Sequence, residues 1–482
     1  MRDFVKLIDE LRKFENETSW IEFKCNNYTP ETIGENICAL ANGAALHEKR
    51  CAYYVWGIED KTHDVVGTTK DFLSLKKGNQ ELELWLRTML SKNADFEYHC
   101  VDYLGKKVGL LLIAPAEKQP VVFQKLAYIK VGSNTKKLHD FPEVEAKLWD
   151  RLRNVNFESR IAKFDLELQE VAKLLETSVY IEMRGMPQPA NMEGAIHYLM
   201  EEELVLRQDN GLFAITNLGA LLLARNLNDF SRISRKAVRV IQYADNSRLD
   251  MLKENTGTKG YVVDFERVMQ YIDALLPSRE VIDGALRQTR SAYPPLAIRE
   301  VVANALIHQD FAITGTGPTI EIFPNRIEIT NPGIPLIDVR RFIDNPPKSR
   351  NEKLALLMRR FRLCEELGTG WDKIVLACEQ ALLPAPRIDV YEEGIKVTLF
   401  AGMPFASIPM EDRLQACYLH ACIKYVQGEQ LTNSSLRKRF GLSASSSGTI
   451  SRLIREAVLR GLIKALDPDT APKHMKYIPE WA

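Results

Sequence analysis

The pattern of apolar and polar positions over the first 150 residues predicts a mixed α/β module. Short apolar runs typical of strands alternate with stretches in which apolar residues recur at helical spacing. Thr29 and Pro30 are a typical helix cap and first-position proline, and Asn42-Gly43 is a typical helix-ending pair. The predicted elements are helices near 3–14, 29–43 and 75–92, strands near 20–25, 51–58 and 126–133, and a hairpin that turns at Leu104-Gly105.

Three further modules follow from the same kind of pattern. Between 160 and 217, three helical stretches precede the run GLFAITNLG, which predicts a small winged helix. Residues 234–400 carry apolar strands around an amphipathic helix at Pro295–Leu306 and end in the strand IKVTLF. A proline-marked stretch, Met403–Met410, separates them from a helical module at 412–482. We therefore expect an α+β multidomain protein with modules at 1–150, 151–230, 231–405 and 411–482.

Composition and charge narrow the class of protein. The 482 residues are 45% hydrophobic and 27% charged, as in folded globular proteins. With 64 basic and 64 acidic residues the chain is not a uniformly cationic binder, but residues 412–482 alone carry 11 basic and 6 acidic side chains. No apolar run approaches the roughly 20 residues of a membrane span, the N-terminus is unlike a signal peptide, and the eight cysteines contain no CxxC pair. We expect a reduced, cytoplasmic protein without a membrane partner.

A set of carboxylates and a lysine in the first module points to phosphodiester chemistry. Glu22 and Lys24 are two residues apart on a predicted strand, so their side chains share one face. Asp60 follows the buried strand 51–58, and Glu17 precedes the first strand. Three carboxylates and a lysine suit metal-assisted cleavage, in which a divalent cation generates hydroxide and neutralises charge. The alternative is that Glu22 and Lys24 form an ordinary surface ion pair.

The motifs around these residues resemble the Alba-like domain of the Schlafen family over roughly 14–140. They are ETSWIEFK, ICALANGAA, VWGIEDKTHDVVG and AYIKVGSNTKKL, in that order. The resemblance implies nucleic-acid binding and, for some members, RNase activity with two glutamates and an aspartate, whose positions here are Glu17, Glu22 and Asp60. Two departures are Gly-Ala in place of the usual Gly-Gly after Ala-Asn, and Lys130 at a strand position where the family often has arginine.

A lysine strip near the end of this module predicts contact with a polyanion. Residues 118–138 hold five lysines and no acid, with Phe123 and Tyr128 between them. Lysines bind phosphates and aromatic rings stack on unpaired bases, so the strip favours RNA or DNA. The alternative is a solvated strand face. The five lysines are Lys118, Lys125, Lys130, Lys136 and Lys137.

A second constellation, in REVVANALIHQD, suits a nucleotide. Glu300 and Asn304 lie at i and i+4 of a predicted helix and therefore on one face. A carboxylate there can activate water, and an amide oxygen beside it can ligate Mg²⁺. Gly368 and Gly370 open a later helix, where backbone amides and the helix dipole favour phosphate. The alternatives are a polar helix face and an ordinary turn.

Residues 290–400 resemble the divergent GHKL ATPases of RecG-like transcriptional regulators. The match lies in YPPLAIREVVANALIHQDF, IEITNPGIP, SRNEKLALLMRR and EELGTGWDKI. The resemblance implies that Glu300 is the general base, that Asn304 ligates Mg²⁺, and that Gly368 and Gly370 contact the phosphates. It also implies that Gly333 lies under the adenine, with Asn331 at the position of the usual adenine-binding aspartate. No Walker A or helicase motif accompanies it.

The C-terminal module has the order of a helix-turn-helix. Its second helix, after the serine-rich turn 443–447, is the candidate reader of a DNA groove. The alternative is a winged helix that binds protein. The candidate DNA contacts are Arg437, Lys438, Arg439, Arg452 and Arg455.

These modules together predict an ATP-binding protein that acts on nucleic acid. The first hypothesis is a Schlafen-like nuclease that needs Mg²⁺ or Mn²⁺, is regulated by a GHKL-type ATPase module and forms a homo-oligomer; antiviral defence is a role by resemblance only. The alternative is an ATP-responsive, DNA-binding transcription regulator without nuclease activity. A third is a scaffold that binds neither ligand. The expected architecture is a Schlafen-like α/β module, a small winged helix, a GHKL-type α/β sandwich and a C-terminal winged helix-turn-helix.

Overall fold

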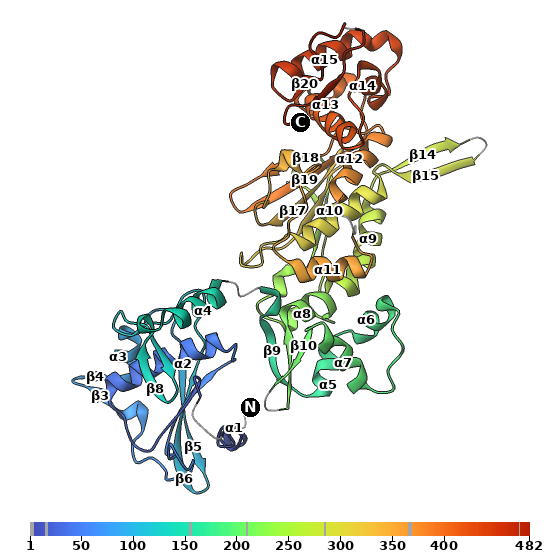
Figure 1. Cartoon of the computed structure of the whole chain (residues 1–482). Coiled ribbons are helices and arrows are strands. Elements are labelled where there is room, and N and C mark those ends of the chain that lie inside the picture. The colour runs from blue at the N-terminus through green and yellow to red at the C-terminus, as the bar shows by residue number, and fades with distance from the viewer. Residues whose placement is uncertain are drawn as a thin grey trace. The chain divides into compact units, whose positions relative to one another are not determined.

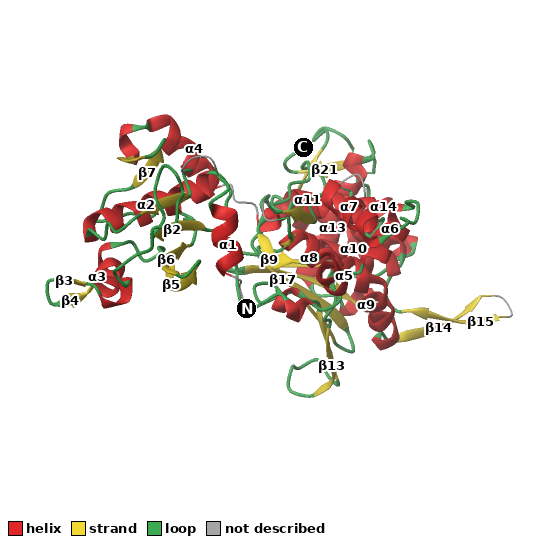
Figure 2. Cartoon of the chain, turned by 90° about the horizontal axis from the view of Figure 1, so that it is seen from below, coloured by secondary structure: helices red, strands yellow, loops and turns green. Residues whose placement is uncertain are grey.

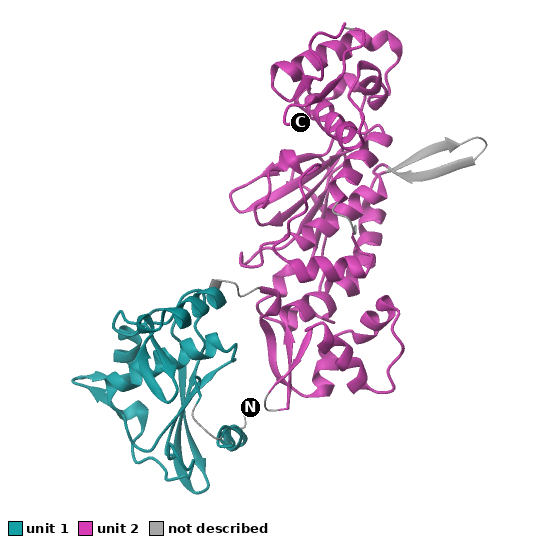
Figure 3. Cartoon of the chain, in the orientation of Figure 1, with its two compact units in different colours: residues 1–155 teal, residues 156–482 magenta. Residues whose placement is uncertain are grey.

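The fold is taken from a computed structural model of the whole chain. It describes residues 4–14, 18–153, 157–208, 211–283, 286–364, 369–471 and 473–482. The chain divides into two compact units, 1–155 and 156–482, which are coloured separately in Figure 3. Each unit is described by itself.

Unit 1 is built on a four-stranded sheet in the order β1-β2-β6-β5. Strand β1 pairs in parallel with β2, because helix α2 connects them, and the remaining pairs are antiparallel. The four strands are β1 (Ile21–Lys24), β2 (Ala52–Trp56), β5 (Phe96–Tyr103) and β6 (Lys106–Ile113). Two short hairpins add β3 (Lys76–Lys77), β4 (Gln80–Glu81), β7 (Tyr128–Val131) and β8 (Asn134–Lys137). The helices are α1 (Phe4–Leu11), α2 (Pro30–Leu46), α3 (Leu82–Met89) and α4 (Pro142–Arg153).

The two faces of this sheet bury different elements (Figure 1). Ile8 and Leu11 of α1 pack on one face with Phe23 and Val55. The other face holds Trp56 among buried residues of α2 and α3. Since side chains alternate along a strand, Glu22 and Lys24 belong to this second face. The sheet therefore points the candidate carboxylate toward α2.

Two sequence predictions in unit 1 are wrong in detail. Helix α2 does not end at Asn42-Gly43 but continues to Leu46. Asn42 instead exchanges hydrogen bonds with the backbone of Val121, and a side chain at Gly43 would collide with the carbonyl of Ser19. The pair therefore serves packing. The helix predicted near 75–92 is confined to Leu82–Met89, because the β3–β4 hairpin occupies the preceding residues.

Unit 2 begins with a small helical region and a three-stranded sheet in the order β10-β11-β9. Its elements are β9 (Ile161–Leu166), α5 (Leu168–Leu174), α6 (Thr177–Arg184), α7 (Met192–Glu201), β10 (Val205–Arg207), β11 (Phe213–Thr216) and α8 (Asn217–Leu223). Three helices precede the β10–β11 hairpin, in the order that the sequence predicts. The run GLFAITNLG forms β11 and then enters α8, and the winged-helix interpretation stays a prediction.

The centre of unit 2 is a six-stranded sheet in the order β13-β12-β16-β17-β19-β18. Its strands are β12 (Arg239–Tyr243), β13 (Met251–Thr256), β16 (Thr319–Ile322), β17 (Arg326–Pro332), β18 (Arg387–Val390) and β19 (Gly394–Phe400). Further elements are α9 (Tyr261–Leu275), the pair β14 (Ser278–Asp283) and β15 (Leu286–Ser291), α10 (Pro295–Ile307), α11 (Glu352–Arg360) and α12 (Gly370–Gln380). The structure confirms the predicted helix at 295–306 and the predicted strands RIEIT and IKVTLF.

The C-terminal region contains α13 (Met410–Val426), α14 (Asn433–Arg439), α15 (Ser447–Leu459), β20 (Ile463–Ala465) and β21 (Tyr477–Pro479), and Figure 2 distinguishes its helices and strands by colour. It has its own apolar core, while one continuous core joins the small helical region, the six-stranded sheet and part of α13.

The mixed α+β, multidomain class is confirmed, and the four-way division stays a prediction. Among the described residues, no helix has the length and apolarity to cross a bilayer. The short 3₁₀ helices are at 72–74, 138–140, 157–159, 227–229, 234–236, 339–341, 405–407 and 444–446.

Candidate functional site

Glu22, Lys24 and Asp60 meet in unit 1, where the end of β1 lies beside the turn that follows β2. The Lys24 ammonium is 3.0 Å from Oε1 of Glu22 and 2.6 Å from Oδ2 of Asp60. It also donates to the carbonyl oxygen of Phe23 at 2.8 Å. One lysine thus bridges two of the predicted carboxylates. Glu17 lies outside the described residues.

The same cluster contains Lys130, whose predicted role as a phosphate contact needs correction. Strand β7 directs the Lys130 ammonium onto Oε2 of Glu22, and the two side chains are 2% and 3% exposed. A buried ammonium paired with a carboxylate does not reach a nucleic-acid backbone. The other members of the lysine strip, Lys118, Lys125, Lys136 and Lys137, are exposed.

Buried hydrogen bonds support the cluster from the α2 side. Tyr54 stands beside Glu22 in the parallel β1–β2 register. Its hydroxyl accepts from Nδ2 of Asn36 at 3.3 Å, and Oδ1 of Asn36 accepts from Thr135 at 2.5 Å. Burial raises the pKa of the Tyr54 phenol, so it stays neutral. Sequence reasoning missed these residues, although the alternation in AYYVW places Tyr54 on the same face as Trp56.

The electrostatics of the cluster limit how a cation binds there. Two ammonium groups neutralise two carboxylates, and both oxygens of Glu22 are engaged. Within the described ranges, no three His, Cys, Asp or Glu side chains are grouped as metal ligands. Asp60 and Lys24 are the accessible members, with side chains 43% and 20% exposed. Glu22 and Asp60 can each ligate a divalent cation only after a lysine releases an oxygen to it.

The nucleotide constellation in unit 2 comes together where α10 meets α12. A Cβ atom on Gly370 would lie 2.9 Å from Oε2 of Glu300 and 3.6 Å from Nδ2 of Asn304. The N-terminus of α12 therefore faces both side chains. Burial raises the pKa of the Glu300 carboxyl, against the opposing charges of Lys373 and Arg299, which suits a proton acceptor. Gly368 lies outside the described residues.

The Arg350 side chain lies against Gly333, one of the two residues predicted to bind adenine. Gly333 follows β17 with φ of 109°, and a Cβ atom there would collide with the Arg350 guanidinium. Arg350 donates to the carbonyl oxygens of Ile334 at 2.8 Å and His308 at 3.4 Å. Asn331 is buried, and its amide donates to its neighbour Pro332. The adenine role of Gly333 and Asn331 stays a prediction, since Arg350 must move before a base can lie on Gly333.

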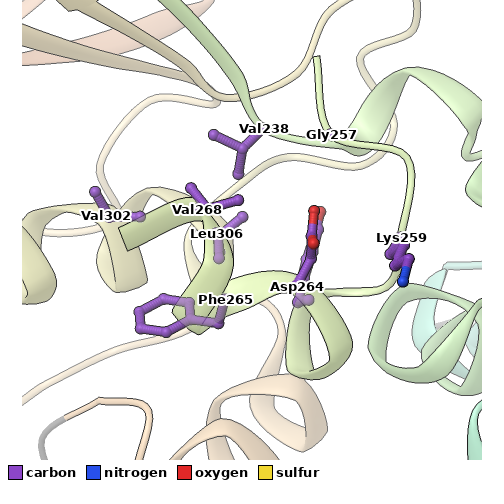
Figure 4. Close-up of a pocket in the computed structure, with 9 residues that line it drawn as sticks. Val238, Gly257, Lys259, Asp264, Phe265, Val268, Val302 and Leu306 are labelled. Atoms are coloured by element: carbon purple, nitrogen blue, oxygen red, sulfur yellow. The ribbon is translucent and has the colours of Figure 1, made fainter. Parts of the chain in front are cut away.

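A hollow shown in Figure 4 lies at another surface of α10. Figure 4 shows Asp264 of α9 close to Gly257, beside the apolar side chains of Val238 and Val268. Asp264 is paired with Arg267 at 2.6 Å. None of the predicted site residues lines this hollow.

The C-terminal basic residues separate into two groups. Lys438 of α14 and Arg452 and Arg455 of α15 are exposed, and Arg437 is half-buried against Asn433. The predicted DNA contact at Arg439 needs correction, because this last residue of α14 faces α12. Its side chain is 2% exposed, and its Nε is 3.3 Å from Oε1 of Glu379.

Two protein-family models match the chain over the regions that hold these sites. The model "Schlafen, AlbA_2" matches residues 17–139, and the model "Putative ATP-dependent DNA helicase recG C-terminal" (HATPase_c_4) matches residues 315–399. The chain contains a Schlafen AlbA_2 domain and a RecG-like HATPase domain. The AlbA_2 match spans the Glu22 cluster. The HATPase match spans Gly333 and Gly370 and begins after Asn304.

The two domains indicate a nucleic-acid-related, ATP-binding protein.

Among solved structures, the chain is similar to the DIP2311 protein from Corynebacterium diphtheriae, with 17% identity, a TM-score of 0.41, and coverage of 99% of this chain and 96% of that one. The comparison with curated proteins gives no match.

Proposed function

We propose that the protein is a metal-dependent nuclease whose AlbA_2 domain binds and cleaves nucleic acid under the control of ATP bound in the HATPase domain. The observation that carries the proposal is that Lys24 bridges Glu22, which is buried, and Asp60, whose side chain is partly exposed. Carboxylates that can hold a divalent cation beside a lysine suit metal-assisted phosphodiester cleavage. Action in antiviral defence and self-association belong to the same proposal.

Each residue of the cluster has a distinct part. Asp60, together with Glu17 and a released Glu22, would hold a divalent cation, which supplies an activated water and neutralises charge. The Lys24 ammonium, once it releases a carboxylate to the cation, would contact the scissile phosphate. Lys136 and Lys137 are exposed on β8, in the same β7–β8 hairpin that carries Lys130. They would contact the phosphate backbone of the substrate.

The residues around Gly370 have matching roles toward ATP. Amides at the N-terminus of α12 favour phosphate, and a side chain at Gly370 would obstruct it. Asn304 would ligate Mg²⁺ through its amide oxygen. Glu300 would accept a proton from water, helped by its raised pKa.

A cleavage assay on the full chain tests the nuclease. The protein is incubated with transfer RNA and with single-stranded DNA, with Mg²⁺ or Mn²⁺, and with or without ATP. We expect Glu22→Gln, Lys24→Met and Asp60→Asn to lose cleavage, and Glu97→Gln, on the exposed part of β5, to retain it. Equal cleavage by wild type, Glu22→Gln and Asp60→Asn would show that the cluster is not the active site. An ATP titration of wild type and Asn304→Ala tests the nucleotide site separately.

The second candidate is an ATP-responsive DNA-binding regulator without nuclease activity. The pairing of Glu22 with two ammonium groups favours it, since the carboxylate is satisfied without a metal. This candidate predicts duplex binding through Arg452 and Arg455 that weakens steeply with salt. No cleavage product would form with any metal.

A further inference from the structure

Helix α12 connects the candidate phosphate site to the C-terminal region. Its first residue, Gly370, faces Glu300 and Asn304, and its last turn carries Glu379. The helix has 11 residues, a length of about 16 Å at 1.5 Å per residue. A rigid helix can carry coupling between its two ends, so a displacement at Gly370 would also move Glu379.

Glu379 is the centre of a buried ion-pair junction. Its carboxylate lies 3.1 Å from Nδ1 of His420 on α13 and 3.3 Å from Nε of Arg439 on α14. Nε2 of His420 is 3.1 Å from the hydroxyl of Ser435, which belongs to the capping box of α14. Arg439 also donates to the carbonyl oxygen of Leu383, just beyond α12, at 2.9 Å. The first helix of the predicted helix-turn-helix is thus fixed to the end of α12.

A second contact joins the C-terminal region to the segment between Gly333 and Arg350. The hydroxyl of Tyr418 on α13 donates to the carbonyl oxygen of Arg340 at 2.6 Å and accepts from Nε1 of Trp481 at 3.1 Å. The guanidinium of Arg341 lies 4.5 Å from the centre of the Trp481 ring. The helix that begins at Gly370 is therefore connected to α13 and α14, and the segment that follows Gly333 is connected to α13.

We infer that nucleotide binding is transmitted to the predicted DNA contacts of residues 410–482 through the Glu379 junction and the Tyr418–Arg340 contact. The inference rests on the proposed nucleotide site and on the duplex binding of the second candidate function, and it names how the first regulates the second. If ATP moves the N-terminus of α12 or the 334–350 segment, the two contacts carry that movement to α14, against which α15 packs. Linkage requires the reverse effect as well: bound DNA changes the affinity for ATP by the same factor.

The test compares four forms of the full chain. Wild type, Glu379→Gln, Tyr418→Phe and Glu411→Gln are titrated with a labelled random-sequence DNA duplex, with and without saturating ATP and Mg²⁺. ATP affinity is measured separately for each form. Tyr418→Phe removes one hydroxyl and keeps the ring, so it retains the fold even if Glu379→Gln does not. Glu411, 73% exposed and paired with Arg460 inside the C-terminal region, is the matched control.

The expected coupling in wild type is a change of about 5-fold or more in duplex affinity on ATP binding. Glu379→Gln should reduce this factor to near 1 and Tyr418→Phe should lower it, while Glu411→Gln keeps the wild-type factor. Amide exchange over 410–439, slowed or accelerated by ATP in wild type only, would give the same answer without DNA. Failure of ATP to bind wild type overturns the proposed nucleotide site together with this inference. Binding of both ligands with no coupling, or full coupling in Glu379→Gln, overturns this inference alone.

Discussion

Replacing Lys130 by methionine separates a structural role for this lysine from a phosphate contact. In the structure the ammonium is buried against Oε2 of Glu22, with only 2% of its side chain exposed. Removing one partner of a buried ion pair leaves the other charge uncompensated and typically costs about 3–5 kcal/mol. Glu22 keeps Lys24 at 3.0 Å from its other oxygen, so we expect the lower end, about 3 kcal/mol.

Scanning calorimetry of the full chain measures this loss. For a unit of this size, about 3 kcal/mol lowers the unfolding midpoint by about 6–12 °C. Lys136→Met, a change to an exposed lysine on the neighbouring strand β8, should remain within about 0.5 kcal/mol of wild type. Adding Glu22→Leu to Lys130→Met should recover much of the stability, because no buried charge is then left unpaired.

Binding of RNA to the same variants completes the comparison. Lys136→Met should reduce the slope of log affinity against log salt by about 1, whereas Lys130→Met should leave the slope unchanged. A Lys130→Met protein as stable as Lys136→Met, or one whose salt slope falls by the same amount, would refute the structural role of Lys130.

Three further predictions concern unit 2. Gly370→Val places a side chain against the Glu300 carboxylate and should weaken ATP binding at least about 10-fold in an equilibrium titration, and unchanged affinity would remove the phosphate from this helix N-terminus. Burial raises the pKa of Asp372 from its ordinary value of 3.8 to about 6, with a further contribution from Asp344. The folded state therefore holds this proton more tightly than the unfolded state, so its stabilising effect is complete below pH 3.8 and is lost as the pH rises through about 6. Asp372→Asn should flatten that part of the pH profile of unfolding free energy, and parallel profiles for the two proteins would contradict it. Arg452→Gln combined with Arg455→Gln should weaken duplex binding and lower its salt slope by about 2, while an unchanged slope would place the DNA elsewhere.

Sequence reasoning succeeded where a site depends on neighbours along one element. The helix expected at 295–306 is found at Pro295–Ile307, and Glu300 and Asn304 both face Gly370. The strand interpretation likewise placed Glu22 and Lys24 on one face, where the structure has them as an ion pair. It failed at Asn42-Gly43, where composition predicts a helix end but tertiary packing extends the helix to Leu46.

By itself, the sequence determined the order of the elements, the two domain families and the residue pairs separated by two or four positions, because the periods of a strand and a helix decide which neighbours share a face. Only the tertiary structure decided which basic residues are buried. Lys130 meets Glu22 across 108 residues, and Arg439 meets Glu379 from a different helix. In the sequence, the lysine strip and the basic end of α14 are both uniformly cationic. In the fold, one basic residue of each is buried and pairs with an interior carboxylate, because burying an unpaired charge is too costly.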